Sequence, residues 1–371
     1  MSSLVQAWAN INSHTHNHAG IVKLLEKIQK AFSRLNPDVM EIVTCGSGLG
    51  LFLKKRRAAQ NQIYLGGHID TVFPAHHPFQ KTTLVDAQTL RGPGVTDMKG
   101  GLVVMLKALE KFEALPEAES LGWEIFLNSD EEIGSAESTP FIEACAQRCD
   151  AAFLFEPTFA DGAFVSARKG SANYTVYSKG KKAHAGRDPG AGKHAIYPLA
   201  RMITEIESLH NPEAETIVNV GLVKGGEALN IIPDYAECGI NVRSTSLVGL
   251  LDARQALERI ASRLGLEIVQ HSFRPPKPLD PPTEALFVAL QECGKRLGQA
   301  IQWRASGGVC DGNTLAAKGV PTLDTLGVRG GEIHTENEYL DLTSLCEKTD
   351  LTALFLQEIA LGKIPLQRIR T

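Results

Sequence analysis

Five short segments of the chain carry histidine and carboxylate side chains that could bind metal ions. They are HID at 68–70, the Gly-rich segment around Asp97, DEE at 130–132, Glu156 and His334. Taken singly, each is more commonly a polar turn or surface pair than a ligand. Together, two histidines and three carboxylates offer the mixed nitrogen and oxygen ligands of a site for two divalent metal ions.

The charges of these side chains match two divalent cations. Metal ions held roughly 3.5–4 Å apart need a bridging carboxylate, which softens their mutual repulsion. With Asp97 bridging, Glu132 and Glu156 terminal and one hydroxide, four negative charges meet four positive ones. One histidine per metal, His68 and His334, completes the set. Zinc suits such ligands, and so do cobalt and manganese, so the residues leave the metal open.

Asp70 stands two residues after His68, at the end of a predicted strand. Side chains two apart on a strand point to the same face. Asp70 can therefore accept a hydrogen bond from the ring nitrogen of His68 that does not face a metal.

The elements that must position these residues alternate along the chain. Apolar periodicity predicts an opening helix at 20–35 and a second at 100–112, with strands at 62–66, 123–128 and 151–155. Strands that alternate with helices indicate an α/β sheet with crossover connections. The candidate ligands follow its strands, where the functional loops of such a sheet gather.

The middle of the chain has a different pattern. We predict strands at 169–178, 216–223, 235–242 and 267–272, and helices at 195–209 and 249–264. This β-α-β-β-α-β order is typical of a compact, ferredoxin-like α+β unit. A proline cluster at 275–278 suits a linker back to the first sheet. We therefore expect a domain at 166–275 inserted into a domain made of 1–165 and 276–371.

Two glycine-rich segments do not have the features of nucleotide sites. CGSGLG at 45–50 is followed by LFLKKRR, which is not a helix start, so a hairpin turn fits better than a dinucleotide site. RDPGAGKH at 187–194 lacks the first glycine of a phosphate loop. It also has His194 where the magnesium-binding hydroxyl belongs.

Composition excludes other classes of protein. The 371 residues, 43% hydrophobic and 22% charged, are typical of a globular protein and long enough for two domains. The net charge of −4 gives no basic face for nucleic acid, and no apolar run approaches the roughly 20 residues of a membrane span. Seven scattered cysteines and no basic leader predict a cytoplasmic protein with reduced thiols.

Several motifs together resemble the M20 metallopeptidases, and most closely their glutamate carboxypeptidase branch. The motifs are GGHIDTVFP (66–74), RGPGVTDMKGG (91–101), NSDEEIGS (128–135), FEP (155–157), KKAHAG (181–186), ALNIIPD (228–234), NVR (241–243), GGVCDGN (307–313) and HTENEYLDL (334–342). As a set they are highly specific, although single motifs are not.

The resemblance implies a role for each candidate ligand. His68 and Glu156 would bind one metal, Glu132 and His334 the other, and Asp97 both. Glu131 would be the general base toward the attacking water, and Asp70 would orient His68. The resemblance also predicts a cis peptide bond between Asp97 and Met98.

It implies further roles for the inserted segment, as a lid and dimerisation domain. His184 would reach across a homodimer to polarise the scissile carbonyl. Asn230 and Arg243 would contact substrate, with Arg274 a weaker candidate and Gly308 a backbone contact. Cys310 departs from the family's usual Ser or Thr, which leaves the shape of the substrate pocket open.

Three functions are compatible with these residues. The first is a carboxypeptidase or N-acyl-amino-acid amidohydrolase, whose lid arginine would bind the substrate's free carboxylate. The second is a deacylase of a biosynthetic diamino acid, of the acetylornithine or succinyl-diaminopimelate type. The third is a non-catalytic binding protein, which the complete ligand set and Glu131 argue against. The motifs GGHIDTVFP and GPGVTDMKGG favour the first.

Overall fold

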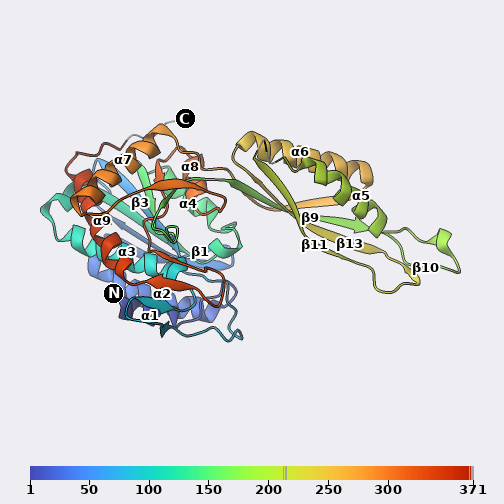
Figure 1. Ribbon diagram of the computed structural model, residues 1–371, viewed down its shortest axis with the longest axis horizontal. Helices are drawn as coiled ribbons and strands as arrows, with labels where there is room; N and C mark the ends of the chain where they lie inside the picture. The colour runs from blue at the N-terminus through green and yellow to red at the C-terminus, as the bar shows by residue number, and fades with distance from the viewer. Residues whose placement is uncertain (212, 214, 367, 369–371) are drawn as a thin grey trace. The chain divides into compact units, whose positions relative to one another are not determined.

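The computed structural model describes residues 1–211, 213, 215–366 and 368 and divides the chain into two compact units (Figure 1). Unit 1 comprises Met1–Ala167, Leu279–Ser306 and Cys310–Thr371, and unit 2 comprises Arg168–Pro278 and Gly307–Val309. The expected insertion at 166–275 differs from unit 2 by two or three residues at each end. Residues 307–309, expected in the first domain, group with unit 2, where Arg243 donates a hydrogen bond to the Gly307 carbonyl at 2.6 Å.

Unit 1 is built on a mixed six-stranded sheet of order β1-β2-β6-β3-β7-β16. The strands are β1 (Val39–Cys45), β2 (Gly48–Lys55), β3 (Asn61–His68), β6 (Leu121–Asn128), β7 (Ala151–Leu154) and β16 (Thr322–Leu323). β6, β3, β7 and β16 run parallel, whereas β1, β2 and β6 pair antiparallel. β1 and β2 form a hairpin in which Cys45 faces Gly48, which confirms the hairpin interpretation of CGSGLG.

Helices cover both faces of this sheet because its central strands are apolar on both sides. In β3, Ile63 and Leu65 join one hydrophobic cluster and Tyr64 joins another. The first cluster includes residues of α1 (Ser2–Ala9), α2 (His18–Phe32), α3 (Gly100–Glu113), α7 (Pro281–Arg296) and α9 (Thr343–Ala360). The second includes residues of α4 (Thr139–Ala146) and α8 (Gly312–Ala317). The helix predicted at 20–35 corresponds to α2, but it does not open the fold, because α1 precedes it.

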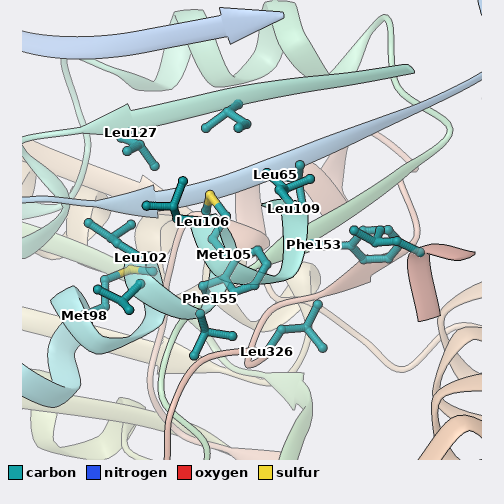
Figure 2. Packing of buried hydrophobic residues seen from close by; sticks show 14 of the residues in the cluster. Leu65, Met98, Leu102, Met105, Leu106, Leu109, Leu127, Phe153, Phe155 and Leu326 are labelled. Carbon is teal, nitrogen blue, oxygen red and sulfur yellow. The ribbon is translucent and has the colours of Figure 1, made fainter. Parts of the chain in front are cut away.

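The packing between α3 and the sheet forms part of the hydrophobic core of unit 1 (Figure 2). Side chains of α3 and its preceding turn pack with strand residues, namely Met98, Leu102, Met105, Leu106 and Leu109 with Leu65, Leu127 and Phe153. Each of these side chains is at most 2% exposed. Truncating such a residue to alanine typically costs about 2–5 kcal/mol, so this contact holds α3 firmly against the strands.

A second, smaller sheet in unit 1 has very short strands and was not predicted. Its order is β17-β18-β5-β4, with β17 (Gly330–Gly331), β18 (Tyr339–Asp341), β5 (Thr89–Arg91) and β4 (Thr83–Leu84). The loop that carries Asp97 follows β5, and His334 lies between β17 and β18. Two further strands, β8 (Phe164–Arg168) and β15 (Trp303–Ser306), pair with each other.

Unit 2 has an antiparallel sheet of order β11-β13-β9-β14. The strands are β9 (Gly170–Lys179), β11 (Thr216–Gly225), β13 (Tyr235–Ser244) and β14 (Glu267–Arg274), and the helices α5 (Ile196–Ile206) and α6 (Leu247–Leu264) pack on one face (Figure 1). The chain order and strand order together are those of a ferredoxin-like unit. A two-stranded ribbon pairs β10 (Ala183–His184) with β12 (Ile231–Ile232). Within the described residues of both units, no helix is long and apolar enough to cross a membrane.

Candidate metal centre

Three neighbouring parallel strands of unit 1 each end close to a candidate ligand. β3 ends at His68, while Glu132 follows β6 and Glu156 follows β7. The register pairs His68 with Asn128, the last residue of β6, so these two strands end at the same level. The carboxyl ends of parallel strands are where the ligands of α/β proteins bind.

Asp97 lies in an irregular turn, Val95–Lys99, between β5 and α3. Gly94 enters the turn at φ 69°, a conformation that glycine adopts without steric cost. Gly101 lets α3 approach the end of β7, because a Cβ there would lie 2.0 Å from the carbonyl oxygen of Phe155. The Asp97–Met98 peptide bond is cis, as predicted.

The two oxygens of the Asp97 carboxylate face different histidines. Oδ1 lies 3.0 Å from Nε2 of His68, and Oδ2 lies 3.3 Å from Nε2 of His334. Glu132 Oε2 lies 3.1 Å from the same His334 nitrogen, and Glu156 Oε1 lies 3.9 Å from the His68 nitrogen. The donors therefore fall into two groups that share Asp97.

The pKa values of the clustered side chains show that positive charge is favoured here. Hydrogen bonds with Asp97 and Glu132 raise the pKa of His334 to about 10. Burial lowers the pKa of His68, but hydrogen bonds with Asp70 and Asp97 outweigh burial and hold that pKa well above its usual value. Burial raises the pKa of Glu132 to about 7. The pKa values of both histidines thus show that positive charge is favoured beside these carboxylates.

This donor set fits two divalent cations. The ligand atoms of His68, Asp97 and Glu132 lie within 4.8 Å of one another, although they come from three different segments. Imidazole nitrogen and carboxylate oxygen are ligands that zinc accepts, and the shared Asp97 is placed as a bridging group for a metal pair would have to be. The residues would hold one ion beside His68 and another beside His334.

Asp70 connects the end of β3 to the turn after β6. His68 Nδ1 lies 3.1 Å from the backbone carbonyl oxygen of Asp70 and 3.3 Å from the side-chain Oδ1 of Asp70. The fully buried Asp70 carboxylate also accepts the backbone N–H groups of Glu131 at 3.3 Å and Glu132 at 3.2 Å. Thr15, which the sequence did not single out, donates its hydroxyl to Asp70 at 2.7 Å. Asp70 therefore contacts both a candidate ligand and the backbone of the candidate base.

His184 and Asn230 lie close together in the β10–β12 ribbon of unit 2. His184 pairs with Ile231, and the Asn230 carbonyl accepts the N–H of Ala185 at 2.9 Å. His184 Nδ1 accepts the N–H groups of Gly186 and Arg187, each at 3.2 Å. With Nδ1 accepting, the ring proton resides on Nε2, which makes that nitrogen a donor.

The two predicted arginines lie on the strands that flank β9. Arg243 of β13 and Arg274 of β14 both pair with Ser171, so their side chains project from the same face of the sheet. Arg243 donates Nη1 to the Gly307 carbonyl at 2.6 Å and Nε to Asn241 Oδ1 at 3.1 Å. Gly308 therefore lies in the segment that Arg243 holds to unit 2.

Cys310 and Glu338 are two residues whose surroundings the sequence did not reveal. The Cys310 thiol is 2% exposed and lies 3.5 Å from Asp324 Oδ2, so it belongs to a buried polar network. Glu338 is also 2% exposed and accepts hydrogen bonds from the turn that carries Asp97. The only signal for Glu338 in the sequence is its place in HTENEYLDL, four residues after His334.

The model of the peptidase family M20/M25/M40 matches residues 64–358, which include all five candidate ligands. The chain belongs to this family. It is accordingly a metallohydrolase, which excludes the non-catalytic alternative. The expected α/β fold is confirmed by similar solved structures, among them proteins of the M20 family. A tripeptidase from Staphylococcus aureus has a TM-score of 0.77 at 23% identity and covers 97% of this chain and 98% of its own.

Other relatives illustrate the range of the family. Carboxypeptidase G2 from a Pseudomonas species is 28% identical over 95% of this chain and 88% of its own length. An acetylornithine deacetylase from Erwinia tasmaniensis is 29% identical over 81% of each chain. A dinuclear metal-binding peptidase of the M20 family from Bacillus subtilis, YXEP, has a TM-score of 0.67 at 17% identity, covering 97% of this chain and 98% of its own.

Proposed function

We propose that the protein is a dinuclear zinc hydrolase that cleaves the amide bond of an N-acyl amino acid or small peptide with a free carboxylate. His68 and Glu156 would hold one ion and Glu132 and His334 the other, with the Asp97 carboxylate shared between them. The observation that carries this proposal is that the two oxygens of Asp97 face two different histidines, at 3.0 and 3.3 Å.

The chemistry follows from these positions. Two such ions, when bound, polarise the scissile carbonyl and make an attacking water more acidic. The Glu131 carboxylate takes a proton from that water and delivers it to the leaving nitrogen as the C–N bond breaks. Asp70 keeps His68 oriented and holds the backbone of Glu131 in place.

The substrate class rests on unit 2. Arg243 and Arg274, at the same level on two strands, suit a carboxylate, which a guanidinium binds through two parallel hydrogen bonds. Asn230 and the Gly308 backbone complete the proposed substrate contacts. The 28% identity to carboxypeptidase G2 over nearly the whole chain favours an amino-acid leaving group.

A matched set of substrates tests this proposal. The zinc-, cobalt- or manganese-loaded enzyme is offered N-acyl amino acids and the corresponding amides, which lack the free carboxylate. We expect hydrolysis of the acids, with kcat/KM at least ten-fold higher than for the amides. Equal rates on both sets would remove the proposed carboxylate requirement.

A second candidate is deacylation of an N-acyl diamino acid. It is favoured by the 29% identity to an acetylornithine deacetylase. The two functions differ in the side chain that the pocket must accept, so rates on N-acetylornithine and on N-acylglutamate distinguish them.

We further propose a homodimer formed through unit 2, in the cytoplasm. β11 is an edge strand of its sheet, and its Leu222 and Val223 are 49% and 58% exposed. An exposed apolar edge is a ready template for pairing with a second copy. Sedimentation velocity tests the dimer.

The cytoplasmic location rests on the cysteines. All seven lie in the described part of the chain and form no disulfide there, which suits a reducing compartment.

A further inference from the structure

Glu338 is a buried carboxylate that none of the roles above employs. It lies four residues after His334, directly before β18, and is 2% exposed. Its Oε1 accepts the backbone N–H groups of Thr96 at 2.9 Å and Asp97 at 3.0 Å, and its Oε2 accepts that of Gly94 at 2.9 Å. Both oxygens of one side chain thus accept hydrogen bonds from the turn that presents Asp97.

The main chain strengthens the same connection. The Glu338 carbonyl accepts the N–H of Gly92 at 3.1 Å, and Thr96 donates its hydroxyl to the Tyr339 carbonyl at 2.6 Å. The segment that supplies His334 and the turn that supplies Asp97 are therefore joined through the main chain at Glu338 and Tyr339 as well. These segments are more than 230 residues apart in sequence, as the separation of 241 between Asp97 and Glu338 shows.

We infer that Glu338 is a positioning residue that fixes the Asp97 carboxylate between His68 and His334, so that two metal ions can share it. This inference rests on the proposed metal centre. A bridging carboxylate must present each oxygen to a different ion, and a rotation of its backbone would favour one ion at the expense of the other. Glu338 restrains that rotation because it binds the N–H of Asp97 itself and the N–H of the residue before it.

Only a carboxylate can accept all three hydrogen bonds that the backbone of this turn donates. Three N–H donors need acceptors, and a glutamine in the same place offers one oxygen and one NH₂ group. The NH₂ group would face a backbone N–H, and the turn would have to shift or leave a buried donor without a partner. Glu338→Gln therefore changes the hydrogen bonding of the turn while it keeps the volume of the side chain.

Cobalt binding to the metal-free protein tests this inference. Glu338→Gln and Glu338→Ala are compared with wild type, with Glu332→Gln and with His334→Ala. Glu332 is an exposed glutamate of the same segment and serves as the matched control. Calorimetric titration gives the number and affinity of bound Co²⁺ ions, and the visible absorption of the bound cobalt reports on its coordination. Circular dichroism and the unfolding midpoint report on the fold.

We expect wild type and Glu332→Gln to bind two Co²⁺ ions with the same spectrum. Glu338→Gln should keep the fold but bind one of the two ions at least ten-fold more weakly, with an altered visible spectrum. If both Glu338 variants bind two ions with wild-type affinity and spectrum, and only their unfolding midpoints fall, Glu338 merely stabilises the loop and the inference is wrong. Glu338→Gln decides the question if Glu338→Ala does not fold.

The failure of the metal centre itself would look different. In that case wild type would bind fewer than two ions, or His334→Ala would bind both as tightly as wild type. Either result overturns the proposed centre, and the positioning role of Glu338 with it. A third outcome overturns the positioning role alone. In it, wild type binds two ions, His334→Ala loses metal binding, and Glu338→Gln binds metal as wild type does.

Discussion

The carboxylate of Asp70 accepts the backbone N–H of Glu132, with 3.2 Å between Oδ2 and the nitrogen. The same carboxylate accepts the N–H of Glu131 at 3.3 Å. Two neighbouring glutamates are thus anchored through their backbones by one buried group, yet the Glu132 side chain extends to His334, at 3.1 Å. Adjacent carboxylates can therefore serve different purposes, one in binding and one in proton transfer.

Alanine at each position separates the two roles. Glu131→Ala should keep nearly full metal content and lose about 10²–10⁴ in kcat, the usual contribution of a general base. Glu132→Ala should lose metal, because it removes a carboxylate from the His334 group. Elemental analysis beside kcat measures both. Metal loss in Glu131→Ala with retention in Glu132→Ala would reverse the assignment.

The close approach of α3 to β7 makes a second prediction. A methyl group at position 101 would lie 2.0 Å from the Phe155 carbonyl oxygen, next to Glu156, and a backbone atom cannot move away cheaply. Gly101→Ala should therefore lower the free energy of unfolding by roughly 2 kcal/mol or more and weaken metal binding. Chemical denaturation and metal titration measure the two effects.

Gly190→Ala is the matched control for this substitution. A Cβ at Gly190 would meet no atom within 4 Å, so its effect on stability should stay within about 0.5 kcal/mol. A Gly101→Ala protein as stable as Gly190→Ala would show that α3 can shift away from β7.

The sequence could predict His68, Glu132 and Glu156 because each ends or follows an apolar strand of the large sheet, whereas Asp97 and His334 lie in Gly-rich segments beside strands that were not predicted. The strands ending at His68 and before Glu132 and Glu156 were located within two residues at their carboxyl ends. Thr15 and Glu338 could not be found in this way, because each acts through a residue far away in sequence. Their partners, Asp70 and the turn of Asp97, become neighbours only when the chain folds.

Parts of the fold could not be predicted from the sequence either. The small sheet escaped prediction because its strands are two or three residues long, too short for any alternation to be recognised. Gly307–Val309 were expected with the first domain, since nothing in three residues indicates a change of unit. In the folded chain Gly307 accepts a hydrogen bond from Arg243 of unit 2, 64 residues earlier in the chain.

Arg243 provides a third prediction, on substrate recognition. Its Nη1 and Nε already bind Gly307 and Asn241, so the guanidinium is held in place while its remaining N–H groups are available to a carboxylate. A lysine has a single ammonium and cannot do both. Arg243→Lys should raise KM at least ten-fold for substrates with a free carboxylate and leave metal content unchanged.

Arg254→Lys is the control, because Arg254 is a surface arginine of α6 that pairs with Glu258 at 2.8 Å. Steady-state kinetics on acids and amides gives the comparison. An unchanged KM in Arg243→Lys would place carboxylate recognition elsewhere.

The last prediction concerns His184, whose Nδ1 accepts two backbone N–H groups and whose Nε2 therefore carries a proton to donate. Loss of a single oxyanion donor typically costs about 10²–10³ in kcat. His184→Ala should lose this much while fold, metal content and dimerisation stay as in wild type. His194→Ala, which removes another histidine of unit 2, half-buried and stacked on Tyr197 with 3.7 Å between the ring centroids, is the control.

A mixture of two inactive variants tests whether His184 acts across a dimer. In a heterodimer of His184→Ala and Glu131→Ala, one site combines its own Glu131 with the partner's intact histidine. Equal mixing and subunit exchange should then restore about a quarter of wild-type activity, since half of the dimers are mixed and each has one complete site. A histidine that acts within its own chain predicts no recovery, because every site would lack one of the two groups. Exchanged dimers that remain inactive would therefore exclude the cross-subunit role, whereas recovery cannot arise in any other way from two defective chains.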